Sequence, residues 1–82
     1  SNQLIRWVMN KEEHADKLQE IVSQYFLTQR LKPSAEKYPQ QLTLLHQMLI
    51  TAMKCKQSTD LSQGLELRDL TSQFKALYLD SK

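Results

Sequence analysis

Three side chains of this 82-residue chain could carry nucleophilic or metal chemistry, namely Cys55, His14 and His46. A cysteine next to a histidine can form a reactive thiolate–imidazolium pair, and a close set of Cys, His and carboxylate side chains can bind a metal ion. Cys55 and His46 are nine positions apart on one predicted helix. At about 1.5 Å per residue they are separated by about 13 Å along the helix axis, which is too far for a catalytic pair.

The two histidines also lack a second metal ligand at a suitable spacing. His14 lies among Glu12, Glu13 and Asp16, which is typical of a surface histidine that pairs with carboxylates. His46 borders a leucine-rich face and is expected at the edge of the core. A chain with a single glycine has no glycine-rich loop for a phosphate group. From the residues alone we expect no catalytic residue, no metal ligand and no cofactor, and we predict that the segment is not an enzyme.

Charge and hydropathy exclude several classes of partner. The net charge is +2, from 11 basic and 9 acidic residues, which disfavours nucleic acid as a partner. The longest unbroken apolar run is Ala76–Leu79, whereas a membrane-spanning helix needs about 20 residues. Basic side chains gather at Arg30, Lys32 and Lys37, where we expect a solvated turn, with an anionic partner surface as the alternative. A lone cysteine fits a reducing compartment, so we predict a cytoplasmic location.

Helices must position these side chains, because apolar residues recur at intervals of three and four along most of the chain. The first helix is predicted over residues 11–31, with Asn10 as its N-cap and Glu13 returning the hydrogen bond. Residues 3–9 either extend this helix or form a separate short one. The break in the pattern favours a bend near Asn10.

Two further helices follow, separated by short hinges. The second is predicted over residues 39–56, beginning at Pro39, whose missing N–H costs nothing in a first turn. The third is predicted to end near residue 80 and to begin at 61 or 65. Its start depends on Gly64, which marks either a cap or a close backbone crossing.

The fold class is therefore predicted to be all-α, a small antiparallel bundle of three main helices, with residues 3–9 as a fourth short helix if the chain bends. We expect a single helical domain over residues 1–82, and the sequence leaves open whether it is a fragment of a longer protein. The second helix is apolar around most of its circumference and is expected at the centre. Cys55 is expected to pack as a small buried hydrophobe. The most buried side chains are predicted to be Leu45, Leu49, Leu70 and Phe74.

The order of the elements resembles the enterocin-type bacteriocin immunity proteins. It comprises a capped first helix, a proline-containing hinge, a leucine-rich second helix and a closing helix rich in Leu, Phe and Tyr. The resemblance spans residues 18–79 and implies a small cytoplasmic helical bundle that protects a producing cell from its own bacteriocin. It transfers no functional residue, because all the matching positions are packing positions. They are Ile21, Val22, Tyr25, Tyr38, Leu42, Leu45, Leu77 and Tyr78.

The function that the sequence favours is a non-enzymatic protein–protein interaction module, as a domain of a larger bacterial regulatory or effector protein. An immunity-like bundle is the first alternative, and a nucleic-acid-binding helical domain is the second. The predicted partner is another protein or a second copy of the chain, because apolar side chains at the chain ends exceed what a three-helix core can bury. A bend at Asn10 would fold the N-terminal segment back toward the end of the third helix. The predicted partner-binding residues are Ile5, Trp7, Met9, Tyr78 and Leu79.

Overall fold

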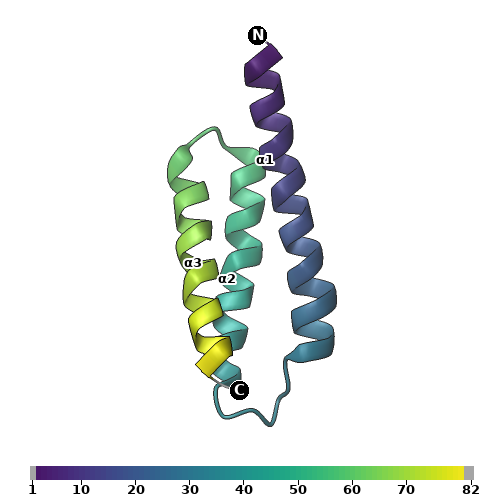
Figure 1. Cartoon of the computed structure of the whole chain (residues 1–82), viewed down its shortest axis with the longest axis vertical. Helices are drawn as coiled ribbons and strands as arrows, with labels where there is room; N and C mark the ends of the chain where they lie inside the picture. Colours follow the sequence, from purple (N-terminus) through teal and green to yellow (C-terminus); the bar gives the residue numbers. More distant parts are fainter. Residues whose placement is uncertain (1, 81–82) are drawn as a thin grey trace.

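The chain folds into three antiparallel helical rods, and the structure describes residues 2–80. In this computed structural model, α1 (Asn2–Glu20) continues directly into the π-helical segment η1 (Ile21–Arg30), and α2 (Tyr38–Gln57) and α3 (Leu61–Asp80) follow. Figure 1 shows α2 between the other two rods, which run in the opposite direction. The predicted all-α bundle of three main helices is confirmed.

The described part of the chain contains no helix that is both long and apolar enough to cross a membrane. The first and last residues of the predicted domain, Ser1 and Lys82, lie outside the described residues, as does Ser81.

The first rod has no bend at Asn10, and the sequence prediction on this point was wrong. Helix α1 passes through position 10 without interruption, so residues 3–9 extend this helix and are not a fourth element. Side-chain contacts of Lys11 support the continuous helix next to this position. Its Nζ donates a hydrogen bond to the carbonyl oxygen of Ser58 and lies 5.2 Å from the ring centroid of Trp7. Asn10 is therefore an exposed position inside a helix, where no cap is needed.

Replacement of Asn10 by alanine tests the continuous helix. We expect Asn10→Ala to leave the free energy of unfolding unchanged or to raise it by up to about 0.7 kcal/mol, because alanine has the higher helix propensity. Thermal unfolding followed by circular dichroism measures the change. Gly64→Ala is a reference with an expected gain of about 1 kcal/mol, since Gly64 lies inside α3 and nothing lies within 4 Å of an added Cβ. A loss of about 0.5–2 kcal/mol at Asn10 would instead indicate an N-cap.

The second half of the first rod is wound as a π-helix, which the apolar periodicity did not predict. In a π-helix the backbone hydrogen bonds join residues that are five positions apart. Two side chains in η1 donate to backbone carbonyl oxygens across the same interval. Thr28 Oγ1 donates to the carbonyl oxygen of Ser23 at 2.6 Å, and Gln29 Nε2 donates to that of Gln24 at 3.0 Å. Extended π-winding is rare, and short π-segments are frequent at functional sites.

Helix α2 is the centre of the bundle, as predicted, because both other rods pack on it. Pro39 lies in its first turn, where no N–H is required. The main core joins all three rods, and a smaller cluster extends it toward the start of α3. Leu45, which is fully buried, lies in the main core. The buried residues are Val22, Leu45, Met48, Leu70 and Phe74 in the main core, and Ala15, Ala52 and Cys55 in the smaller cluster.

Three of the four predicted core residues are confirmed, and the fourth is wrong. Leu45, Leu70 and Phe74 are buried, but Leu49 is only half-buried and packs against the core from the side. The reason is that two rods cover only part of the circumference of α2. Other apolar side chains of this helix also stay exposed, such as Met53 at 42%.

Helix α3 begins at a side-chain cap and continues through Gly64. The carboxylate of Asp60 accepts a hydrogen bond from the backbone N–H of Ser62 at 2.9 Å. Hydrogen bonds from the backbone and then the side chain of Ser62 lower the pKa of Asp60. Because α3 is continuous from Leu61 and the space beside Gly64 is open, Gly64 marks neither a cap nor a close crossing.

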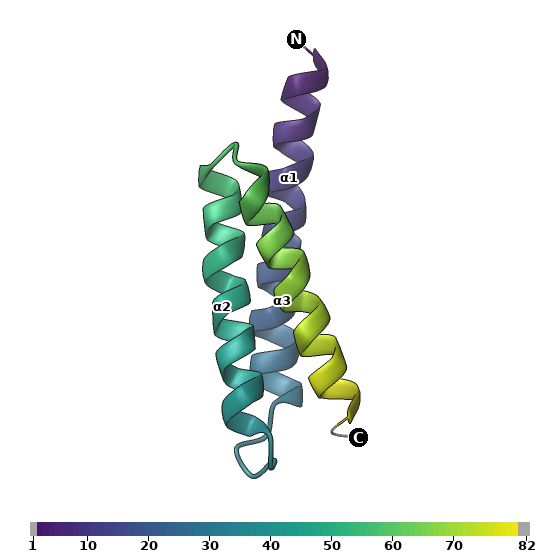
Figure 2. The ribbon, with the colours of Figure 1, turned by 90° about the vertical axis from the view of Figure 1, so that its left-hand side faces the viewer.

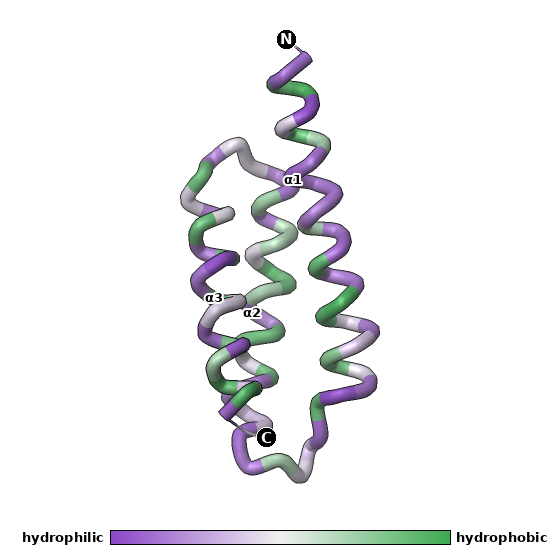
Figure 3. The backbone as a smooth tube through the Cα atoms, in the orientation of Figure 1, coloured by the Kyte–Doolittle hydropathy of each residue, from purple (hydrophilic) through white to green (hydrophobic). Residues whose placement is uncertain are grey.

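The N-terminal turns of α1 project beyond the ends of α2 and α3 (Figures 1 and 2). In Figure 3 this projecting end carries hydrophobic positions in green. Leu4 and Ile5 are 60% and 56% exposed. The apolar stripe of the first rod therefore continues past the bundle that it packs on.

Candidate functional site

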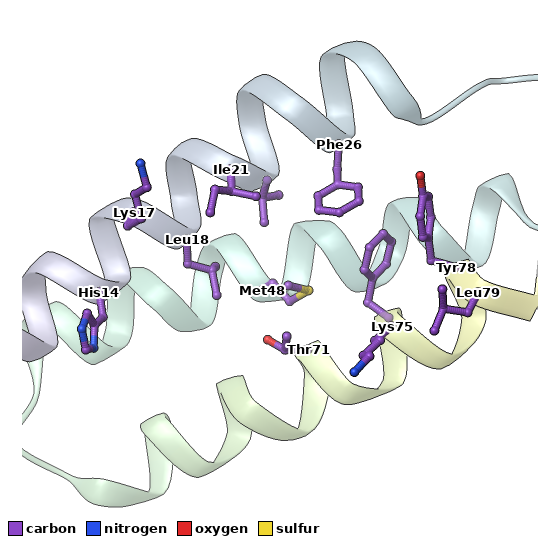
Figure 4. A pocket seen from close by; sticks show the side chains of 12 residues that line it. His14, Lys17, Leu18, Ile21, Phe26, Met48, Thr71, Lys75, Tyr78 and Leu79 are labelled. Carbon is purple, nitrogen blue, oxygen red and sulfur yellow. The ribbon is translucent and has the colours of Figure 1, made fainter.

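An apolar groove lies between the first rod and α3, with α2 as its floor. Among the described positions, no Cα atom of α1 or η1 lies within 8 Å of a Cα atom of α3, because both rods pack on α2 instead. Figure 4 shows Leu18 and Phe26 on one wall, Thr71 and Tyr78 on the other, and Met48 between them. The groove has a volume of about 480 Å³.

Positive charge flanks this groove on both sides. His14 and Lys17 line it from α1, Lys75 lines it from α3, and no acidic residue is part of the lining. Within residues 2–80 neither lysine has an ion pair or a hydrogen bond. The ion pair that this part of the chain does contain joins Lys56 Nζ to Asp16 Oδ1 at 2.7 Å, away from the groove. The groove therefore combines an apolar interior with unpaired cations on opposite edges.

Three aromatic rings close the groove at the end of η1. The ring of Phe26 meets that of Phe74 edge to face at a centroid distance of 5.0 Å, and meets that of Tyr78 at 5.4 Å. Phe74 and Tyr78 are stacked at 5.6 Å. Arg30 Nε donates a hydrogen bond to the Tyr78 hydroxyl oxygen at 3.0 Å, and this bond raises the pKa of Arg30. These side chains join two rods whose backbones stay apart.

Cys55 is buried between the first rod and α2, as predicted for a small hydrophobe. Burial raises the pKa of its thiol, and the positive charge of Lys11 offsets part of this effect. A thiol that serves as a nucleophile needs a lowered pKa, because the thiolate is the reactive form. The burial of Cys55 in the smaller core cluster supports a packing role.

The raised pKa of Cys55 predicts slow thiol chemistry and a loss of stability at alkaline pH. We expect the folded chain to react with a thiol reagent more slowly than the urea-unfolded chain, by on the order of tenfold or more. Because folding raises this pKa, the neutral thiol stabilises the fold below the unfolded value of about 8.5, and this contribution is lost as pH rises. Urea titrations from pH 7 to 10 should show a steeper decline for the parent than for Cys55→Ala. Equal slopes would contradict the assignment.

The two histidines lie on different rods and are both exposed. The predicted pairing of His14 with neighbouring carboxylates is absent among the described residues, since Asp16 pairs with Lys56 instead. His14 lies at the edge of the groove. His46 was expected at the edge of the core, and it lines a second apolar pocket, of about 470 Å³, together with Leu49.

The predicted partner-binding residues do not form one surface. Ile5, Trp7 and Met9 are exposed on the projecting end of α1, at 56%, 41% and 63%. Tyr78 and Leu79 lie at the opposite pole, because the helix that was expected to bend back is straight at Asn10 (Figure 1). Leu79 is exposed, whereas Tyr78 is half-buried against the aromatic rings. Both residues line the groove, which sequence reasoning missed.

Residues 2–80 provide no set of metal donors. No group of three or more His, Cys, Asp or Glu side chains in this part of the chain could hold a metal ion. Cys55 is buried as a neutral thiol, and the exposed His14 and His46 lie on separate rods. The described helices therefore do not form a metal centre by themselves.

Comparison with known proteins places the chain in a family. No curated protein and no solved structure matches it. A family model described as nickel-containing superoxide dismutase matches residues 1–82. This match overturns the prediction that the chain is not an enzyme, and with it the non-enzymatic interaction module. The same match overturns the alternative function, a bacteriocin-immunity-like bundle. Because the match spans all 82 residues, the chain belongs to the nickel-containing superoxide dismutase family.

Proposed function

We propose that the chain serves the dismutation of superoxide as the helical body of a nickel-containing superoxide dismutase. The observation that carries the proposal is the match of that family's model to all of residues 1–82. In the overall reaction two superoxide anions and two protons give one dioxygen and one hydrogen peroxide. One superoxide is oxidised and the other is reduced, so the electrons balance without a further reductant.

The side chains on these helices do not form a nickel-binding site. We therefore propose that the helices have a structural role in the enzyme. A redox metal needs several donor atoms at one point, whereas the donors of residues 2–80 are scattered or buried. In this proposal nickel supplies the redox chemistry when bound, and its ligands are not drawn from the described helices. The packed core around Leu45 then serves as the rigid element on which the metal site is held.

Nickel content and superoxide decay together test the proposal. The intact protein is produced with added nickel, its metal is measured by mass spectrometry, and superoxide decay is followed by pulse radiolysis. We expect decay to accelerate in proportion to bound nickel, to slow on chelation and to recover on nickel addition. Nickel-loaded protein that leaves superoxide at its spontaneous rate of decay would contradict the proposal.

Two substitutions separate a structural role of the helices from a metal-binding role. Cys55→Ala and His46→Gln are expected to retain both nickel and activity, because neither side chain belongs to a donor cluster in the described part of the chain. Helix content by circular dichroism controls for folding. Loss of nickel from either variant with its helix content intact would assign that side chain to the metal.

Location and partner belong to the same proposal. A cytoplasmic location is supported by Cys55, a lone and unpaired thiol in the chain. Contact with another protein or with a second copy of the chain is supported by the projecting end of α1. There the apolar side chains of Ile5, Trp7 and Met9 extend beyond the bundle.

Trp7 fluorescence tests contact at this projecting end. In the isolated chain at low concentration we expect red-shifted emission, because 41% of Trp7 is exposed. Association should shift the emission to shorter wavelength, since the ring would leave water. A concentration series combined with sedimentation detects a second copy, and titration with a candidate protein detects a different partner. An emission maximum that is shielded in the dilute monomer would contradict the exposed placement.

A further inference from the structure

We infer that a polar pocket between α2 and α3 binds a small zwitterion, an α-amino acid with an apolar side chain. The lining of this α2–α3 pocket shares no residue with the lining of the groove. The inference concerns a ligand site and its charges. It goes beyond the nickel reaction, so its test uses no superoxide.

The α2–α3 pocket lies next to the hinge that joins these two antiparallel helices (Figure 1). Its volume is about 480 Å³. Small-molecule sites in proteins have volumes of about 300–1,000 Å³, so the pocket is large enough for an amino acid. Its lining includes the buried Leu70 and, at 36%, the partly exposed Ile50.

Two side chains of opposite charge line the pocket from opposite walls, Lys54 from α2 and Glu66 from α3. Lys54 lies three positions before Gln57, where α2 ends. Glu66 lies five positions after Leu61, where α3 begins. At about 1.5 Å per residue these positions are about 4.5 Å and about 7.5 Å from the hinge. The two charges therefore lie at nearly the same level of the bundle.

Neither charge has a partner in the part of the chain that the structure describes. Lys54 and Glu66 form no ion pair with each other or with another described residue, and neither side chain has a hydrogen bond there. The carboxylate of Asp60 in the hinge is outside the lining and accepts a hydrogen bond from the N–H of Ser62. A cation and an anion that line one pocket without pairing are complementary to a ligand that carries both charges.

The neighbours of these charges specify the rest of the ligand. Ile50 is four positions from Lys54 on α2, and Leu70 is four positions from Glu66 on α3, so each apolar side chain shares a helix face with one charge. Both lie one turn further from the hinge. An amino acid whose carboxylate binds Lys54 and whose ammonium group binds Glu66 can therefore cover Ile50 with an apolar side chain. The amide of Gln63, also in the lining, can hydrogen-bond to either end group.

Ligands with a single charge fit the pocket less well. A simple carboxylate would pair with Lys54 and would be repelled by Glu66, and a simple amine would meet the reverse. A zwitterion is the ligand that pairs with both walls at once.

Leucine and two of its analogues test the inference. N-acetyl-leucine keeps the carboxylate and lacks the ammonium charge, whereas leucinamide keeps the ammonium group and lacks the carboxylate. Each compound is titrated into the isotope-labelled protein at neutral pH and constant ionic strength, and binding is followed by NMR chemical shifts of the backbone amides. We expect leucine to bind with a dissociation constant on the order of a millimolar and to shift amides of the pocket. Each analogue should bind at least about threefold more weakly, because it loses one of two ion pairs.

Neutral variants locate each preference at one wall. Lys54→Gln should remove the preference for leucine over leucinamide, and Glu66→Gln should remove the preference over N-acetyl-leucine. The exchange Lys54→Glu with Glu66→Lys keeps both charges on opposite walls, so it should bind leucine within about threefold of the parent. Lys32→Gln and Glu12→Gln are the matched controls, because they remove the same charges at exposed positions outside the pocket. Both controls should keep both preferences. Partial unfolding would weaken all three compounds alike and leave these ratios unchanged.

Several outcomes would overturn the inference. These are no saturable shift with leucine, equal affinity for leucine and both analogues, shifts confined to residues outside the pocket, and preferences that the two neutral variants leave unchanged. If Lys54 and Glu66 instead pair with each other in solution, Glu66→Gln would release Lys54. N-acetyl-leucine would then bind this variant more tightly than leucine binds the parent, and that result would also exclude the proposed site.

Discussion

Truncation of Leu45 to alanine is expected to lower the free energy of unfolding by about 2–5 kcal/mol. Leu45 is fully buried, and it packs in the cluster that joins all three rods. Its removal leaves a cavity that α2 cannot close without moving away from a neighbour. In a domain of this size such a loss is a large fraction of the whole stability. Urea unfolding followed by circular dichroism measures the change.

Leu42→Ala is the matched control for this substitution. It makes the same chemical change on the same helix, but the Leu42 side chain is 38% exposed. We expect it to cost about 1 kcal/mol or less, because little of the side chain leaves an apolar environment. Leu49→Ala, at a half-buried position, should lie between the two. Equal losses at Leu42 and Leu45 would show that α2 is not packed as described.

The difference between Leu45 and Leu49 shows how far periodicity predicts a core. The spacing of apolar residues identified the helices and the central position of α2, because these follow from which residues can share a face. It could not tell which side of an apolar helix would be covered. That depends on where the two other rods lie around α2, and two rods leave part of its surface open.

The uninterrupted helix at Asn10 has a similar explanation. Asn10 and Glu13 form a good local capping pattern, and the apolar stripe lapses at Lys11. In the fold, Lys11 reaches the carbonyl oxygen of Ser58, which is 47 positions away in the sequence. A local pattern cannot reveal this contact, so the sequence favoured a bend where the structure has a continuous helix.

Neither the groove nor the family was predicted from the sequence, and the two failures have different reasons. Ile21 and Phe26 fall within the helix predicted over residues 11–31, and only the placement of α3 shows that they line a groove. The enzyme reading was rejected because no catalytic set was found among these residues. The match of the family model to residues 1–82 shows that this prediction was wrong, because family membership comes from the whole pattern of the chain. The lack of a recognisable catalytic motif among these residues therefore did not exclude membership of an enzyme family.

Truncation of Phe74 to alanine is expected to be at least as costly as that of Leu45, at about 3–5 kcal/mol. Phe74 is 5% exposed and contacts the rings of Phe26 and Tyr78. Ring pairs of this kind contribute about 0.5–1.5 kcal/mol beyond the buried area. Without the Phe74 ring, the first rod and α3 lose one of the aromatic contacts that join them across the groove.

Tyr25→Ala is the control, because Tyr25 also meets Phe26 edge to face, at 5.0 Å, but is 44% exposed. It should cost about 1 kcal/mol or less. A double-mutant cycle between Phe26 and Phe74 should show a coupling of about 0.5–1.5 kcal/mol, and a coupling near zero would mean that the rings are packed independently.

If these helices hold the metal site of a superoxide dismutase, Phe74→Ala should also reduce bound nickel and activity in the intact protein to the same extent. The reduction should deepen with temperature as the folded fraction falls. Activity lost at a temperature where the variant remains fully folded would place Phe74 in the chemistry itself and not in its support.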